Sequence, residues 1–353
     1  MYKRQDYGQT WHAPALGFQA AAYALAFHPT QPGAVYAGLG WWPDQPRLVR
    51  SDDGGLTWGD AAPGLNLLTV YQMVKAEGIL RVATNGSGVH TRWPGDPVVW
   101  ESTSSISPGN DLSYVTRLAT DGGDSASFLA FDKGDQTLYR LASGNLPWQP
   151  VLHLDKAGDE VYDLLYDPQQ PTRAYATTRL SGLWRSTDSG ATWSAANTGL
   201  PGGAVLRGLA VDPVVGTLYA GQTGAPGRLH TSLDDGDSWS PLNDDLTFTT
   251  MHAFAADPAD PDVAYAGAWG GGTWKTTDGG ASWTLLPEAP VSAAVLAVDP
   301  HDPQTIYATD RTEPTLWQSA DGGQRWWRRF RAGDEYSRLQ ALAVDPHQAD
   351  TVY

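Results

Sequence analysis

One octapeptide recurs along this chain of 353 residues, and its spacing constrains the fold more than any other feature. Its general form is Ser/Thr-x-Asp-x-Gly-x-Thr/Ser-Trp, and the five near-complete copies occupy residues 51–58, 186–193, 232–239, 276–283 and 319–326. Shorter or eroded copies end at Trp11, Trp100 and Trp148, so that successive terminal tryptophans are 42 to 48 residues apart. A repeat of this length built from short segments is typical of propeller blades with four strands each.

The unit at 206–242 shows how one repeat divides into strands. Gly, Pro and Asp separate runs rich in β-branched and aromatic residues, which predict strands at 206–213, 216–223, 228–234 and 238–242. The first run is apolar on both faces, which predicts a strand buried on both sides beside the propeller axis. The expected fold is all-β, a single β-propeller of four-stranded antiparallel blades. Seven complete repeats predict a ring of seven blades, or of eight if the incomplete repeats at the two ends combine.

Both ends of the sequence are expected to be incomplete. Residues 6–11, DYGQTW, are the second half of one octapeptide, and the last residues, LAVDPHQADTVY, stop within a repeat. We expect residues 1–5, MYKRQ, to be a non-native junction. Residues 6–353 are expected to be the repeat propeller, cut at both ends from a longer chain.

Composition argues against several classes of function. A net charge of −16 disfavours nucleic acid, whose phosphates require a basic surface. No apolar run approaches the ~20 residues that span a bilayer, so membrane insertion is not expected. The chain has no cysteine and its eight histidines share no metal-ligand spacing, so we expect no disulfide, metal or cofactor. A monomer is expected.

We interpret the octapeptide as a structural turn between the third and fourth strands. Its Gly supplies a positive φ, its Asp and Ser/Thr accept hydrogen bonds from turn amides, and its Trp packs beneath the turn. Identical turns spread around a ring cannot converge on one substrate, as catalytic groups must. A calcium loop is the alternative, because DDGDS at 234–238 is rich in acids. That segment lacks the spaced oxygen ligands and the closing Glu of an EF-hand.

The octapeptide resembles the Asp-box, or BNR, motif of sialidases. The unit LAVDPHDPQTIYAT…LWQSADGGQRW is similar to repeats of xyloglucan-active hydrolases of glycoside hydrolase family 74, of sortilin-type receptors and of photosystem II assembly factors. The resemblance runs from Asp6 to the end of the chain and implies a propeller whose Asp boxes lie on the face away from the active site. We also expect an extracellular or periplasmic location for the protein. The Phe/Tyr-Arg-Ile-Pro stretch of sialidases and the Arg-Thr-Asp-Val-Gly-Gly-type segment of family 74 do not occur in this sequence.

Functional side chains are therefore expected on the face opposite the boxes. The joins between second and third strands hold three tryptophans beside glycines, in GLGWWPDQPR and GAWGGG, which could bind a sugar ring or a partner side chain, or pack under their own loops. The starts of the first strands carry varied side chains, where binding specificity would be encoded. We predict a non-catalytic binding or assembly module for a glycan or a protein partner, with ligand-binding residues Trp41, Trp42, Trp269, Tyr23, Tyr162, Arg207, His252 and Arg338.

The alternative is a glycoside hydrolase, xyloglucanase-like or sialidase-like, or part of one. Glycosidases use two carboxylates separated by ~5 to 9.5 Å. Candidate acids lie in three expected loops, although solvated loop charges give the same pattern, and no catalytic residue is assigned among Asp159, Glu160, Asp244, Asp245, Asp334 and Glu335.

Overall fold

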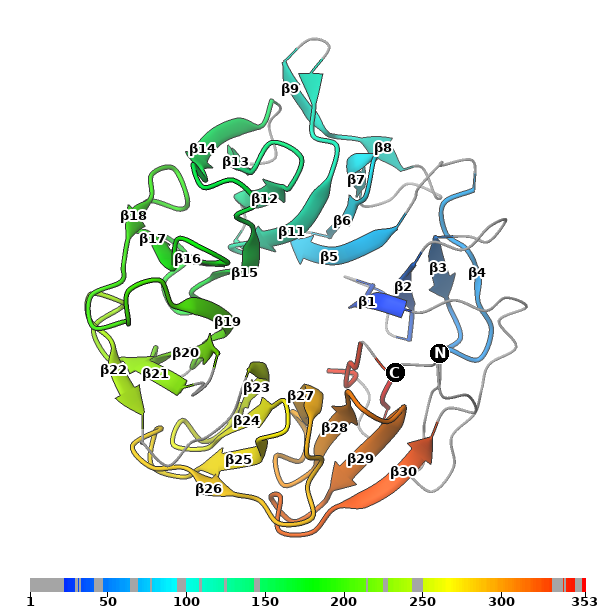
Figure 1. Ribbon diagram of the computed structural model, residues 1–353. Helices are drawn as coiled ribbons and strands as arrows, with labels where there is room; N and C mark the ends of the chain where they lie inside the picture. The colour runs from blue at the N-terminus through cyan, green and yellow to red at the C-terminus, as the bar shows by residue number, and fades with distance from the viewer. Residues whose placement is uncertain are drawn as a thin grey trace. The chain divides into compact units, whose positions relative to one another are not determined.

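The chain is an all-β protein over the part that the structure describes (Figure 1). The structure is a computed structural model, and it describes residues 22–28, 31, 33–40, 47–63, 69–76, 78–93, 100–107, 110–123, 126–142, 147–213, 215–224, 228–242, 250–331, 339, 341–346 and 351–353. Over these residues there is no α-helix, and seven sheets have four antiparallel strands each. The predicted fold class, seven four-stranded antiparallel blades of a β-propeller, is confirmed.

In every sheet the strands follow chain order. The first blade consists of β1 (Ala22–Phe27), β2 (Val35–Leu39), β3 (Leu48–Ser51) and β4 (Gly59–Asp60). The second consists of β5 (Val70–Ala76), β6 (Ile79–Thr84), β7 (Gly88–Arg92) and β8 (Glu101–Ser102). After an extra hairpin of β9 (Ser105–Ser107) and β10 (Asn110–Asp111), the third consists of β11 (Val115–Thr120), β12 (Phe128–Asp132), β13 (Thr137–Leu141) and β14 (Gln149–His153).

The remaining four blades repeat the same order. The fourth consists of β15 (Val161–Tyr166), β16 (Ala174–Thr178), β17 (Leu183–Ser186) and β18 (Ser194–Ala195). The fifth consists of β19 (Val205–Val211), β20 (Leu218–Thr223), β21 (Arg228–Ser232) and β22 (Ser240–Leu242). The sixth consists of β23 (Met251–Ala256), β24 (Ala264–Ala268), β25 (Gly272–Thr276) and β26 (Thr284–Leu285). The seventh consists of β27 (Ala293–Val298), β28 (Ile306–Asp310), β29 (Thr315–Ser319) and β30 (Trp327–Arg331).

The blades belong to two compact units. The first unit contains the described residues up to Ala176 together with Arg185–Ser194, and the second contains Thr177–Trp184 and the residues from Ala195 onward. Within the first unit, β1, β5, β11 and β15 lie side by side, and within the second unit β19, β23 and β27 do so. Each unit is therefore a stack of sheets whose first strands are neighbours.

The first strands are less buried than the sequence predicts. β1 has one buried, one exposed and four half-buried residues, and β19 mixes buried with half-buried residues. The second strands β2, β6, β12, β16, β24 and β28 are buried throughout. A first strand is the edge of its sheet, so one of its sides has no strand paired to it. A second strand is flanked by strands on both sides, which explains its complete burial.

The hydrophobic core lies between successive sheets. A tyrosine on the second strand recurs and is fully buried, as Tyr36 and Tyr219 show. The terminal tryptophan of the next repeat packs edge-on against it, with ring centroids 6.4 Å apart for Tyr36 and Trp100 and 6.1 Å apart for Tyr219 and Trp283. The periodic tryptophans therefore pack in the space between one blade and the preceding blade.

Most first strands carry a β-bulge close to their beginning. The register shifts between residues 22 and 24 of β1, 70 and 72 of β5, and 251 and 253 of β23. A bulge inserts one residue and turns its side chain away from the regular pleat. The inserted residues, at the start of these strands, are Tyr23, Tyr71 and position 252.

After the seventh blade two short segments of the chain pair with each other through one isolated β-bridge. Val344 and Val352 form an antiparallel bridge, and Ala343 and Tyr353 exchange backbone hydrogen bonds of 3.1 and 2.9 Å. Val352 packs with Tyr307 and Leu316 of the seventh blade.

Candidate functional site

The Asp boxes are closed hydrogen-bonded turns. In the box at 186–193, Oδ1 of Asp188 accepts hydrogen bonds from the Ser186 hydroxyl and the Thr192 amide, both at 2.8 Å, and Oδ2 accepts from the Thr192 hydroxyl at 2.6 Å. The Gly190 amide donates to Oγ of Ser186 at 2.8 Å, and the φ of Gly190 is 83°. The box side chains thus satisfy one another and the turn, as the structural interpretation predicts.

Three of the boxes also contact the preceding blade through the carbonyl of their fourth residue. This carbonyl accepts a hydrogen bond from the Tyr219 hydroxyl at 2.8 Å in the case of Gly279, and from Nζ of Lys275 at 2.9 Å in the case of Gly322. In the same way Nε of Arg140 donates to the carbonyl of Ser189 at 2.7 Å. These three boxes therefore fasten consecutive blades to each other.

A row of four tyrosines lies at the opposite ends of the strands in the first unit. We call Tyr23, Tyr71, Tyr114 and Tyr162 the tyrosine row; they stand at or next to the beginnings of β1, β5, β11 and β15. In the first blade β1 pairs antiparallel with β2, and β2 pairs antiparallel with β3. The start of β1 therefore lies at the same end of the blade as the end of β2 and the start of β3. The box follows the end of β3, so the start of β1 and the box lie at opposite ends of the blade.

The centre of the tyrosine row is a pair of stacked rings. The ring centroids of Tyr71 and Tyr114 are 6.0 Å apart with an angle of 28° between the rings, and their hydroxyl oxygens are 3.4 Å apart. Burial, followed by the contact with the Tyr114 hydroxyl, raises the pKa of Tyr71 to about 12. The Tyr71 phenol is therefore neutral near pH 7 and can donate or accept a hydrogen bond.

Tyr23 is the most exposed member whose exposure the structure records, with 39% of its surface accessible. Its ring lies against Gly40, where an added Cβ would come within 2.5 Å of Cε2 of Tyr23. The other end of the row is fixed by Arg117 of β11, whose Nε donates to the carbonyl of Tyr162 at 2.6 Å. The tyrosines thus lie on strands that are connected to one another by side-chain contacts.

The acids next to the tyrosine row are engaged in the fold. Glu160 forms an ion pair with Lys133, and Nζ of Lys133 lies 6.0 Å from the ring centroid of Tyr114. Asp159 is only 1% exposed, and its Oδ1 accepts from the Glu160 amide at 3.0 Å. No group of three or more His, Asp or Glu side chains placed for a metal ion occurs among the described residues.

Two of the predicted ligand-binding residues whose side chains are described, Trp269 and Arg207, belong to the second unit. Trp269, in the join between β24 and β25, is 47% exposed, and the guanidinium of Arg311 lies 5.0 Å from its ring centroid. Arg207 lies in β19 directly before Gly208, where the register shifts and φ is 72°. The Trp269–Arg311 pair spans the second-to-third joins of two adjacent blades.

Several predicted residues lie outside the described part of the chain. These are Trp41, Trp42, Arg338, Asp244, Asp245, Asp334 and Glu335. Position 252 belongs to β23, and nothing is described of the His252 side chain. The predicted residues Tyr23 and Tyr162 lie in the tyrosine row, which also contains two residues that the sequence analysis missed, Tyr71 and Tyr114. In other repeats an Asp-Pro pair follows the first strand and fixes where that strand starts, at 167–168, 212–213, 257–258, 299–300 and 345–346. The repeats of Tyr71 and Tyr114 lack this pair after the first strand, and only the bulge marks the equivalent position in β5.

The comparisons with known proteins agree with the box geometry. A family model described as Sortilin, neurotensin receptor 3 (Sortilin-Vps10) matches residues 227–351. A xyloglucanase from a Paenibacillus species is 27% identical over 254 residues. The chain is an Asp-box β-propeller.

The match to the Paenibacillus xyloglucanase covers 59% of this Asp-box propeller and 24% of the enzyme, so the chain spans about a quarter of that relative. Sqt1 from Chaetomium thermophilum has a TM-score of 0.64 at 14% identity, over 96% of this chain and 87% of Sqt1. YCF48 from Cyanidioschyzon merolae has a TM-score of 0.51 at 14% identity, over 90% of this chain and 87% of YCF48, and a second YCF48 structure is bound to a D1 peptide. The propeller is thus related in sequence to xyloglucanases and shares its fold with YCF48. Its described residues include no helix able to cross a membrane.

Proposed function

We propose that this Asp-box propeller is a non-catalytic module that binds an uncharged polysaccharide segment along the tyrosine row. The observation that carries the proposal is the set of tyrosines at the starts of four adjacent strands, with Tyr23 exposed and Tyr71 and Tyr114 stacked. Aromatic faces with neutral hydroxyls combine an apolar surface with hydrogen bonds, the two features that sugar rings require.

A glycan is favoured over a peptide because the sequence relatives of this chain are named xyloglucanases. The likeness to YCF48 bound to a D1 peptide, at 18% identity, supports a propeller fold and leaves a protein segment as the competing ligand. A neutral ligand also agrees with the protein's net charge of −16, which opposes the approach of a polyanion.

The second candidate function is glycoside hydrolysis, which the same xyloglucanase relatives support. A glycosidase would require an acid free to donate a proton and a second carboxylate beside the same bond. Glu160 is paired with Lys133, and Asp159 is buried, which makes both poorly suited to that task. The binding module is therefore the function that these residues support best.

Calorimetric titration with xyloglucan oligosaccharides, run beside an assay for released reducing sugar, tests the proposal. We expect binding without sugar release, and a loss of affinity of about tenfold in Tyr23→Ala or Tyr71→Ala, equivalent to roughly 1.4 kcal/mol of stacking and buried area. Trp327→Ala is the matched control, because Trp327 is 40% exposed on the outer strand β30 and should not contribute.

Three outcomes would contradict the proposal. Sugar release that disappears in Glu160→Gln would indicate the hydrolase. Binding of peptides with no glycan bound would indicate a protein partner. Unchanged glycan affinity in the double variant Tyr23→Ala/Tyr71→Ala would remove the tyrosine row from the binding site, whatever the ligand.

A further inference from the structure

The outer strand of the seventh blade, β30, lies in the segment of the sequence with the most concentrated positive charge. Four of the seven residues at 325–331, RWWRRFR, are arginines, in a chain with 23 basic and 39 acidic residues. The acids nearest to this segment in the sequence are Asp321 and Asp334. The wider segment 322–338 has five arginines and two acids, so its net charge is +3 in a chain whose net charge is −16.

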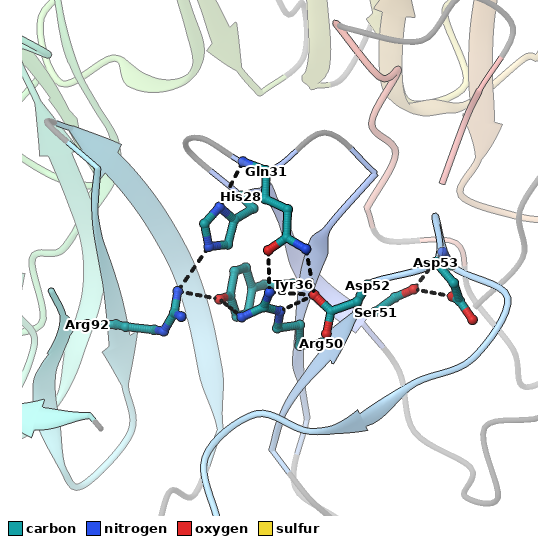
Figure 2. Close-up of polar contacts among 9 residues, drawn as sticks. His28, Gln31, Tyr36, Arg50, Ser51, Asp52, Asp53 and Arg92 are labelled. Atoms are coloured by element: carbon teal, nitrogen blue, oxygen red, sulfur yellow. Dashed lines mark hydrogen bonds and ion pairs between the residues drawn. The ribbon is translucent and has the colours of Figure 1, made fainter. Parts of the chain in front are cut away.

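Two arginines of the first two blades are, by contrast, used within the fold. Figure 2 shows Arg50, whose guanidinium pairs with Asp52 and donates to Oε1 of Gln31 at 2.7 Å. In the same view Nη1 of Arg92 donates to the Tyr36 hydroxyl at 2.7 Å. Both arginines are half-buried, and their guanidinium groups stabilise contacts inside the protein.

A β-bulge places two exposed arginines of β30 on the same face of the seventh sheet. Arg328 lies opposite Trp317 of β29. Arg331 lies opposite Thr315, because the register shifts next to Trp317. Residues three apart in a regular strand point to opposite faces, whereas Trp317 and Thr315, two apart, share one face. Arg328 and Arg331 therefore point to the same side, with their backbones roughly 7 Å apart. Both are exposed, and 60% of the Arg328 side chain is accessible.

Tryptophan rings lie beneath guanidinium groups on both faces of β30. Cζ of Arg328 lies 4.8 Å from the ring centroid of Trp317. On the other face, Cζ of Arg329 lies 5.5 Å from the ring centroid of Trp327, which is 40% exposed. Nε of Arg329 also donates to Oε1 of Gln318 at 2.9 Å. A guanidinium held over a ring has already lost part of its rotamer freedom, so fixing it in a complex costs less entropy.

The acids that contact this segment leave its charge positive. Oε2 of Glu313 lies 3.7 Å from Nη1 of Arg328, and 40% of the Glu313 side chain is accessible. An exposed ion pair of this length contributes little, so it competes weakly with another carboxylate. Asp321 belongs to the box turn, where its Oδ1 accepts from the Arg325 amide at 2.9 Å. The four arginines at 325–331 and these two acids together have a net charge of +2.

We propose that β30 docks an extended acidic segment of a partner protein. We call its side chains the Arg–Trp edge, and they are Trp317, Trp327, Arg328, Arg329 and Arg331. Carboxylates at alternate residues of an extended chain are about 7 Å apart, which matches the backbone spacing of Arg328 and Arg331. Guanidinium groups form strong, often bidentate, hydrogen bonds with carboxylates. Salt screens charges more than about 8–10 Å away, so the positive edge acts locally in an acidic protein.

The composition of the Arg–Trp edge favours a protein over an acidic polysaccharide. Trp and Arg are the residue types most enriched where protein interfaces bind tightly, and exposed tryptophan is otherwise uncommon. The edge belongs to the second unit, whereas the tyrosine row belongs to the first. The inference therefore does not depend on the proposed function.

The same features also protect an edge strand, since bulges and charged side chains hinder the addition of a further strand. The partner is therefore expected to contact the side chains of β30 and not to extend its sheet. A purely protective role predicts aggregation when the arginines are removed and no binding of an acidic peptide by the wild type. Docking predicts saturable binding.

Fluorescence anisotropy on the whole chain, with a labelled peptide in which Glu alternates with Ser, tests the proposal. We expect saturable binding at about 50 mM salt that weakens as salt increases, and no binding of the matched peptide with Gln at every Glu position. Affinity should fall at least tenfold in Arg328→Gln/Arg331→Gln. The control, Arg179→Gln/Lys156→Gln, removes the same charge at two exposed positions outside the edge and should bind as the wild type does.

A conservative variant gives a second readout. Arg328→Lys/Arg331→Lys keeps both charges and should recover most of the affinity that the Gln variant loses; if it binds as weakly as the Gln variant, charge pairing is not the basis of binding and the proposal fails. If the double Gln variant unfolds, Arg331→Gln alone, at the end of β30, should weaken binding at least threefold.

Three further results would overturn the proposal. The first is the absence of saturable binding of the acidic peptide to the wild type. The second is an equal loss of affinity in the control variant, because net charge and not the edge would then be responsible. The third is binding of polygalacturonate or of phosphatidylserine vesicles without binding of the acidic peptide, which would assign the edge to another class of partner.

Discussion

Replacing Asp188 by Ala isolates the contribution of one box to stability. The carboxylate accepts three hydrogen bonds, from the Ser186 hydroxyl, the Thr192 amide and the Thr192 hydroxyl. In the variant, water can take the place of the carboxylate at Thr192, which is exposed. The three hydrogen bonds therefore do not each contribute their full free energy to stability. A net hydrogen bond contributes about 1 kcal/mol and a lost capping side chain about 1 to 2 kcal/mol, so we expect the variant to lose roughly 1–2 kcal/mol of unfolding free energy.

Thermal unfolding followed by circular dichroism measures this loss. For units of this size 1 kcal/mol corresponds to roughly 2–4 °C, so the melting temperature of Asp188→Ala should fall by about 2–8 °C. Asp155→Ala is the control, because Asp155 is exposed and outside any box, and it should change stability by less than about 0.5 kcal/mol.

Ser186→Ala extends the test to the inside of the turn. Oγ of Ser186 accepts from the buried Gly190 amide, so its removal leaves a donor that water cannot reach easily and should cost about 1–3 kcal/mol. The double variant should lose less than the sum, because Ser186 and Asp188 are bonded to each other. If Asp188→Ala abolished ligand binding while the melting temperature stayed unchanged, the description of the box as a fastener would be wrong.

Three further predictions concern titration and inter-blade contacts. Hydrogen bonds from the side chain and amide of Thr57 lower the pKa of Asp53 to about 2. The stability that this depressed pKa contributes is present above about pH 4 and is lost as the pH falls towards 2. The urea midpoint of unfolding should therefore drop less steeply over this pH range in Asp53→Asn than in the wild type. Burial, then Arg228, lowers the pKa of His230 to about 4, so its NMR signal should stay that of a neutral ring at pH 5.5, and a charged ring there would contradict this. Tyr219→Phe removes the hydrogen bond to the Gly279 carbonyl and should cost about 1 kcal/mol in chemical unfolding, whereas an unchanged midpoint would show that packing alone joins these blades.

The repeat made the fold predictable, because the octapeptide marks the same hairpin in five of the seven blades and its terminal Trp continues the spacing in the other two. Trp193 and Gly190 have the roles that the motif implies: Nε1 of Trp193 donates to the Gly190 carbonyl at 3.0 Å within the turn. Strand boundaries in the fifth blade agree closely with the sequence runs, since β19 covers Val205–Val211 and β20 covers Leu218–Thr223. Local turn chemistry and periodic burial together determine this level of structure.

The candidate sites were less predictable because they depend on deviations from the repeat. Tyr71 becomes part of the tyrosine row through a bulge in β5, and a bulge is a feature of strand register that no motif records. The partial burial of the first strands was likewise not predictable from their apolar composition. It follows from sheet order, because each first strand lies at the edge of its sheet.

The direction of the box contacts has a consequence for the order in which the chain folds. The acceptor on Gly279 belongs to the sixth blade, and its donor, Tyr219, belongs to the fifth; the same order holds for Gly322 and Lys275. A ribosome releases the amino-terminal partner first. In these two cases the hydrogen bond between blades can form only after the box of the later repeat has been synthesised, so this contact forms one repeat behind the point of synthesis.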